Sequence, residues 1–253
     1  MNVQPLWNLD QPGLSNDVVH FTGRSGTHQN NDVLPAIHAM TAQDRLEAIL
    51  RDRRIRAFRP YGCFGQRSVC FSEATEAGLA ALVLQGRYAP WGLGFAKTTV
   101  FRAGGGPALY VRGSDWADVR DSNLSPRVKA FATRFWPGAQ PEAGEDPLPD
   151  HLAKPSQWAH EREWRLPLDG EAPEFAFALA DVRILVLGSE EWLDALDAVA
   201  GAGTLAQLGH VDVKVLPDHE DHVEEAADEE DDPWNPFGLS LEERIALGLP
   251  PYD

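Results

Sequence analysis

The hydrophobic positions in the first ninety residues repeat with two different periods. Two short segments, 18–22 and 68–72, are rich in β-branched and aromatic residues, which favour strands. Two others, 42–54 and 75–85, place leucine, isoleucine and valine three and four positions apart, which is the spacing of one helix face. Thr41 precedes the first of these, and an acidic residue follows three positions later, a pairing typical of a helix N-terminus. The pattern predicts amphipathic helices packed on a sheet.

The middle of the chain is richer in glycine. Residues 88–97 combine glycines with aromatic residues and predict a turn that leads into a strand. We expect further strands at 100–102 and 108–112, joined by the triplet Gly104-Gly105-Gly106. This triplet has neither the G-x-G-x-x-G spacing of a dinucleotide site nor the ending of a P-loop, so a connection is expected there.

The last patterned segments predict a strand at 182–187, a turn and helix cap at 188–189, a helix through Trp192 and Leu196, and a strand at 211–215. This order fits one right-handed βαβ unit. Most other strands are joined too briefly for parallel pairing. The sequence therefore predicts an α+β fold with a mixed, mainly antiparallel sheet, flanking helices and one C-terminal βαβ unit.

Charge divides the chain into two parts. Residues 217–232 hold ten acidic residues and no lysine or arginine, and removing those ten charges from the net charge of −17 leaves −7. We expect a single α+β domain over residues 1–216, and an acidic linker with a C-terminal docking peptide over 217–253. The arginine-rich run 51–56 fits a solvated helix end.

Composition excludes several classes of protein. The N-terminus lacks the basic and apolar regions of an export signal, and no apolar run approaches about 18 residues, so a cytoplasmic protein without membrane contact is expected. The two cysteines, Cys63 and Cys70, lack C-x-x-C spacing and fit reduced thiols. The mildly acidic body has no basic stripe of the kind that nucleic-acid binders carry.

Glu161-x-Glu163, flanked by tryptophans and arginines, is the sharpest candidate for chemistry. On a strand both carboxylates would face one side, and like charges so close raise the pKa of at least one of them, which suits an acid or a base. The alternative is that alternating glutamates and arginines on a strand form cross-strand ion pairs on a solvated face. His20, in an apolar strand, is either a catalytic group or a core residue with one hydrogen bond.

Three other patterns are weaker candidates for chemistry and have plain structural explanations. Ser72 has no G-x-S-x-G elbow around it, which gives no support to a hydrolase nucleophile. His219-x-x-His222 fits an acidic tail better than a metal site, and no metal is expected. Asp212-x-Lys214 is similar to part of a nuclease site but lacks the neighbouring acidic motif.

Several motifs occur in a definite order along residues 17–216. They are His20-Phe21-Thr22, Val69-Cys70-Phe71-Ser72-Glu73, the segment 88–97, Pro107-Ala108-Leu109-Tyr110-Val111 and Glu161-x-Glu163-Trp164-Arg165-Leu166. In this order they resemble bacterial AbiGi-type abortive-infection proteins and a related uncharacterised bacterial family with a Trp-x-x-Glu-x-Glu-Trp-Arg signature. Both are distantly similar to ADP-ribosyltransferases, including DarT-like enzymes, which implies an ADP-ribosyltransferase-like fold.

The resemblance implies NAD as the substrate and a role for each matched residue. His20 would bind a ribose hydroxyl, Thr22 or the Gly23 backbone would approach the nicotinamide amide, and Arg24 or Arg165 would balance the pyrophosphate charge. In catalysis, Glu163 would stabilise the cationic centre, Glu161 would activate the acceptor, and Ser72 would orient a glutamate.

The resemblance also leaves two functions open. The first is an NAD-dependent ADP-ribosyltransferase-like protein that modifies a macromolecular acceptor, a protein or a nucleic acid, in phage defence or a toxin system. The alternative is a catalytically inert binding protein on the same fold, an antitoxin or a phage-protein sensor, with a protein partner held through the C-terminal tail. His20 precedes a phenylalanine, not the glycine found in poly-ADP-ribose polymerases, and Ser72 is not in a Ser-Thr-Ser motif.

Overall fold

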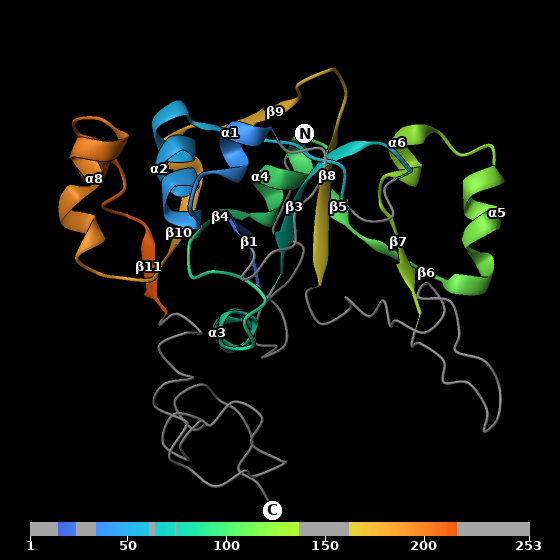
Figure 1. The fold of residues 1–253 in the computed structure, drawn as a ribbon, viewed down its shortest axis with the longest axis horizontal. Coiled ribbons are helices and arrows are strands. Elements are labelled where there is room, and N and C mark those ends of the chain that lie inside the picture. Colours follow the sequence, from blue (N-terminus) through green and yellow to red (C-terminus); the bar gives the residue numbers. More distant parts are fainter. Residues whose placement is uncertain (1–14, 24–33, 61–63, 74, 137–161, 217–253) are drawn as a thin grey trace, which may run out of the picture.

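The computed structural model describes residues 15–23, 34–60, 64–73, 75–136 and 162–216 (Figure 1). The strands are β1 Asp17–Phe21, β2 Arg54–Arg56, β3 Arg67–Ser72, β4 Gly92–Ala96, β5 Gly106–Pro107, β6 Leu109–Arg112, β7 Ala132–Phe135, β8 Glu163–Leu168, β9 Glu174–Ala176, β10 Val182–Leu187 and β11 Asp212–Val215. The α-helices are α1 Pro35–His38, α2 Ala42–Asp52, α3 Glu76–Leu84, α4 Lys97–Arg102, α5 Trp116–Asp121, α6 Pro126–Lys129, α8 Trp192–Ala200 and α9 Thr204–Gln207, and two 3₁₀ turns are η1 Gly113–Asp115 and η3 Leu179–Asp181.

A mixed, mostly antiparallel sheet organises these elements. Its seven strands follow the order β11-β10-β4-β1-β3-β8-β5, and every neighbouring pair except β10–β11 is antiparallel. The parallel pair is joined through α8 and α9, which confirms the expected C-terminal βαβ order. The α+β class and the mainly antiparallel sheet are also as the sequence predicts.

The two faces of this sheet carry different layers. Val18 of β1 packs in the larger core with residues of α2 and α8, while Val19 packs with α3 in a smaller cluster on the other face. This alternation follows from the strand geometry, because successive side chains point to opposite faces. In Figure 1, α2 and α8 stand near each other at one end of the sheet, and α3 lies below it.

Helix α2 is fixed at both ends by features of its own sequence. The Thr41 hydroxyl accepts a hydrogen bond from the Asp44 amide and the Asp44 carboxylate accepts one from the Thr41 amide, so the expected capping box is formed. Leu46 and Leu50 are fully buried against the sheet, and burial of each contributes about 1.5–3 kcal/mol. Arg53, with a left-handed φ of 56°, ends the helix and turns the chain directly into β2.

Two smaller sheets flank the main one. β2 pairs antiparallel with β9 beside the C-terminal end of α2, and β6 pairs parallel with β7 near α5 and α6, at the opposite end in Figure 1. The sequence did not predict β2, β7 or β9. We relate this to their length, since three or four residues show too little alternation to be recognised.

One expected strand is a helix. Residues 100–102 belong to α4, which starts directly after β4, and not to a strand. Val100 is fully buried there and Lys97 is buried as well, while Phe101 is half-exposed, so this short helix packs on the body through one side. The β-branched residues of this segment favour a strand locally, and packing overrides that preference.

No helix in the described part of the chain has the length and the apolar character needed to cross a bilayer.

Candidate functional site

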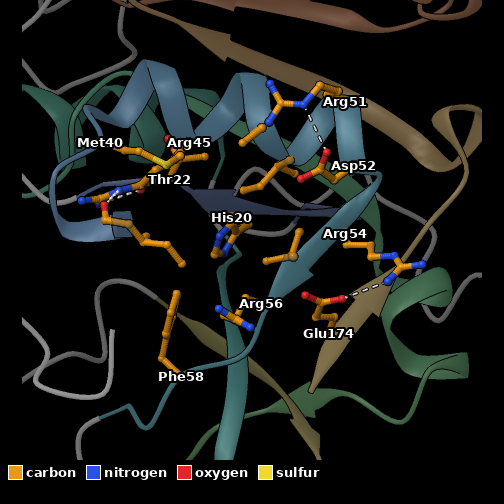
Figure 2. A pocket seen from close by; sticks show the side chains of 14 residues that line it. His20, Thr22, Met40, Arg45, Arg51, Asp52, Arg54, Arg56, Phe58 and Glu174 are labelled. Carbon is orange, nitrogen blue, oxygen red and sulfur yellow. Dashed lines mark hydrogen bonds and ion pairs between the residues drawn. The ribbon is translucent and has the colours of Figure 1, made fainter. Parts of the chain in front are cut away.

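A pocket of about 550 Å³ lies between α2 and the β2–β9 pair, with His20 of β1 among its lining residues (Figure 2). Its volume is within the range of about 300–1,000 Å³ that is usual for small-molecule sites. The described residues that line it are His20, Thr22, Ile37, Met40, Arg45, Ala48, Ile49, Arg51, Asp52, Arg54, Ile55, Arg56, Phe58 and Glu174. Four guanidiniums and two carboxylates give this lining a net charge of +2, although the chain as a whole is strongly acidic.

His20 presents a hydrogen-bond acceptor to this pocket. Its Nδ1 lies 2.8 Å from the backbone oxygen of Cys70 on β3, and because a carbonyl only accepts, Nδ1 must carry the hydrogen. Burial lowers the pKa of His20 below its ordinary value, against the smaller opposing effect of that hydrogen bond, which favours the neutral ring. In the neutral ring Nε2 then has a free lone pair, while one ring edge contacts Phe71 at 5.9 Å between centroids.

The arginines of the pocket fall into two groups. Arg51 and Arg54 lie at its rim, and each forms an ion pair of 3.2 Å, with Asp52 and with Glu174. Arg45 instead donates to two backbone oxygens, those of Thr22 and Ile37, and it has no carboxylate partner in the described part of the chain.

The fourth guanidinium, that of Arg56, is half-buried and has no hydrogen bond or ion pair within the described residues. In Figure 2 its side chain extends from β2 below the His20 ring, with Phe58 beside the same hollow. The pocket therefore contains two guanidiniums, Arg45 and Arg56, whose charge no acid offsets. Burial lowers the pKa of Arg45 from its ordinary value.

Thr22 and Gly23 connect β1 to the start of α2. The Thr22 hydroxyl lies within hydrogen-bond distance of the backbone oxygens of Ala42, at 2.6 Å, and Trp91, at 3.0 Å, and its one hydrogen is engaged by these two acceptors. A Cβ at Gly23 would lie 2.8 Å from the Cβ of Ala42, and only glycine allows this approach. The two residues hold α2 over His20, and the Thr22 oxygen remains able to accept.

Glu163 is held by Arg165 on the same strand. Its two carboxylate oxygens accept from Nε and Nη2 of Arg165 at 2.8 and 3.0 Å, a bidentate ion pair. Nη1 of Arg165 also donates to the backbone oxygens of Ala130 and Ala132, at 3.1 and 2.6 Å. The Arg165 side chain is 1% exposed and that of Glu163 is 11% exposed, so this ion pair is buried and not on a solvated face.

The expected site residues do not lie together. Ser72 is opposite Glu163 in the β3–β8 register and opposite Val19 in the β1–β3 register, so all three share the face covered by α3. His20 follows Val19 on β1 and therefore faces the other way, into the pocket under α2. The structure thus brings Ser72, Glu163 and Arg165 together on one face, and His20 and Thr22 on the other.

Glu73, directly after the last residue of β3, and Lys97, the first residue of α4, form a second buried ion pair on the His20 face of the sheet. Lys97 Nζ is 2.5 Å from Glu73 Oε1, although the two atoms are not aligned as a hydrogen bond, and Glu73 Oε2 accepts from Trp164 Nε1 at 2.9 Å. Both charged side chains are buried. These contacts tie the start of α4 to β3 and β8.

Several expected residues have other placements. Glu161, Arg24, both residues of the His219-x-x-His222 pair and the whole segment 217–253 lie outside the described residues. Asp212 and Lys214 form an ion pair with each other at 3.1 Å, with Asp212 well exposed. Within the described ranges no three histidine, cysteine or acidic side chains gather closely enough to hold a metal ion.

Sequence reasoning did not identify the arginines as pocket residues. The arginine-rich run 51–56 predicts one solvated helix end, but the helix stops at Asp52 and Arg54–Arg56 forms β2. A signal was present, because Ile55 between Arg54 and Arg56 is a short polar–apolar–polar alternation, and Ile55 is indeed buried. Arg45 and Phe58 gave no such signal.

Comparison with protein-family models, with curated proteins and with solved structures finds no match to this chain.

Proposed function

We propose that this protein binds NAD in the pocket around His20 and acts as an ADP-ribosyltransferase-like protein on a macromolecular acceptor, in phage defence or a toxin system. The pocket itself is the observation that supports the proposal. Its acceptor nitrogen, two unneutralised guanidiniums and aromatic ring complement the hydroxyls, phosphates and flat rings of a dinucleotide. The resemblance in motif order supplies the choice of NAD.

The proposed reaction breaks the bond between C1′ of the nicotinamide ribose and the nicotinamide nitrogen. Nicotinamide leaves with the bonding electron pair, C1′ gains cationic character, and an acceptor nucleophile bonds to C1′ and loses its proton. A fixed carboxylate would stabilise the cationic centre. The motif order proposes Glu163 for this role, but the bidentate pair with Arg165 offsets its charge and the sheet separates it from His20.

This separation favours a second candidate, a catalytically inert protein that binds its ligand on the same fold. Such a protein would keep the pocket and would use Glu163 and Arg165 only to hold β8 against the segment around Ala130. Its partner would be another protein, contacted through residues 217–253.

Calorimetric titration of NAD into the full chain tests the pocket. We expect binding to the wild type and at least about tenfold weaker binding to His20→Asn, which removes one ligand hydrogen bond and part of the packing. His210→Asn is a matched control, because this histidine also contacts a backbone oxygen, that of Val182, but lies outside the pocket. Absence of NAD binding to the wild type would overturn the proposal.

Release of nicotinamide separates the two candidates. A wild-type protein that releases nicotinamide when acceptor-rich cell extract is added is a transferase. One that binds NAD with no release above the buffer rate is an inert binding protein. Loss of release in Glu163→Gln, with the variant folded, would assign catalysis to Glu163 despite its ion pair.

A further inference from the structure

We infer that Arg56 and Arg45 bind a phosphate group in the pocket, and that the ligand is a phosphorylated sugar with a hydroxyl hydrogen-bonded to His20. This inference rests on the proposed use of the pocket as the ligand site, and it names the part of the ligand that the pocket recognises. It adds Arg56 and Arg45, which the motif order does not indicate, and it requires no chemical step.

Two of the four guanidiniums in the pocket, those of Arg45 and Arg56, have no carboxylate partner among the described residues. Of the four guanidiniums in the pocket, those of Arg51 and Arg54 are paired with carboxylates at the rim. Arg56 is half-buried with no such partner among the described residues, and a cation removed from water in this way gains strongly from an anionic ligand.

The guanidinium of Arg45 is held in position by the protein before a ligand binds. Its Nε and one Nη1 hydrogen are bound to the backbone oxygens of Ile37 and Thr22, which leaves three of its five N–H groups for a ligand. The guanidinium is therefore already positioned, and a ligand would not need to order it.

His20 adds a hydrogen-bond acceptor to the same pocket. Its Nδ1 hydrogen is used by the Cys70 carbonyl, so the neutral ring offers the pocket an acceptor and no donor. An acceptor of this kind suits a hydroxyl and not a phosphate oxygen. Because Arg56 and His20 line the same cavity, the pocket combines a hydroxyl site with a phosphate site, the two groups that a ribose phosphate carries (Figure 2).

Substitution of Glu174 is expected to strengthen the binding of a phosphorylated ligand. It is the direct cross-strand neighbour of Arg56, yet its carboxylate pairs with Arg54, at the diagonal position. Glu174→Gln would free Arg54 and remove one negative charge from the lining. We therefore expect Glu174→Gln to bind a phosphorylated ligand about two- to fivefold more tightly, since an exposed charge contributes modestly.

The test is calorimetric titration of ADP-ribose, ribose 5-phosphate and ribose into the full chain and its variants. We expect Arg56→Gln to weaken the binding of both phosphorylated ligands by about tenfold to a hundredfold, which is the effect of losing hydrogen bonds to a charged group. Arg51→Gln is the matched control, because it removes the same charge from the same lining but from an arginine that is already paired, and less than about a threefold change is expected.

The remaining outcomes separate this inference from the proposed function. If Arg56→Gln and Arg51→Gln lost equal affinity for the phosphorylated ligands, the effect would be one of general charge, and the inference would be overturned. Equal loss of affinity for ribose and for ADP-ribose in Arg56→Gln would also overturn it. NAD binding that Arg56→Gln leaves unchanged would overturn the inference and leave the proposed function standing. Arg56-dependent binding of ADP-ribose, without nicotinamide release from NAD, would support the inference and remove the catalytic proposal.

Discussion

Substitution of Arg165 by methionine separates a structural role of Glu163 from a catalytic one. The change keeps an unbranched apolar stem of similar width but shortens the side chain, and it removes the bidentate pair with Glu163 and the two bonds to the backbone oxygens of Ala130 and Ala132. Breaking a buried ion pair while one partner remains costs about 3–5 kcal/mol. For a domain of this size, about 2–4 °C of melting temperature is lost per kcal/mol, so Tm should fall by about 6–20 °C.

Glu163→Gln is expected to have a smaller effect on the same measurement. The amide keeps one oxygen that can accept from Arg165 and loses the other, and a hydrogen bond to a charged group contributes about 1.5–3 kcal/mol. Because the two residues share one interaction, the double variant should lose less stability than the two single variants together, with a coupling of at least about 1 kcal/mol. The control is Glu174→Gln, whose exposed pair with Arg54 is worth at most about 1 kcal/mol.

Equilibrium unfolding in urea, followed by circular dichroism, measures these differences. If Arg165→Met lost less than about 1 kcal/mol and the coupling were zero, the buried pair would not exist in solution. Glu163 would then be free for chemistry. If the losses are as large as expected, any activity lost in Glu163→Gln has to be compared with a variant of equal instability before it is assigned to catalysis.

Three further outcomes are expected. Burial lowers the pKa of His20 in the folded protein below its ordinary value of 6.5, so the unfolded chain binds this proton more readily. The associated stability is complete above about pH 6.5 and is lost as the pH falls toward the folded pKa. In urea unfolding, the wild type should therefore lose more free energy of unfolding between about pH 7.5 and about pH 5 than His20→Asn does. Thr41→Ala removes the side-chain acceptor at the start of α2 and should cost about 1 kcal/mol in urea unfolding, whereas an unchanged midpoint would mean that the cap contributes nothing. Gly92→Ala would place a Cβ 2.8 Å from the backbone oxygen of His20, which cannot move aside cheaply, so a loss of about 1–3 kcal/mol together with weaker ligand binding is expected by thermal melting and calorimetry.

Local sequence signals predicted the long elements well. The capping box at Thr41 and the β-branched, aromatic and apolar runs in 18–22, 68–72 and 182–187 each correspond to an element that the structure contains. These signals are local, since a helix cap or a strand face depends on residues a few positions apart.

The arrangement of the candidate site depended on long-range register, which a single sequence does not contain. His20, Ser72 and Glu163, which the resemblance assigns to one site, lie on β1, β3 and β8, three consecutive strands in the sheet order. Which face each side chain occupies is set by pairing: a shift of one residue between β1 and β3 would bring His20 and Ser72 to the same face. In the pocket, Arg56 of β2 lines the same cavity as His20 of β1, an arrangement that no local sequence pattern encodes.

The strand β11 has a consequence for how copies of this chain meet. It stands at the end of the seven-strand order and, among the described strands, pairs only with β10, so its outer backbone groups face no further strand there. An edge of this kind invites another chain to add a strand and extend the sheet. Here the strand is four residues long and carries the Asp212–Lys214 ion pair, which an incoming strand would have to desolvate or displace. The edge is thereby protected against growth into a sheet shared between molecules.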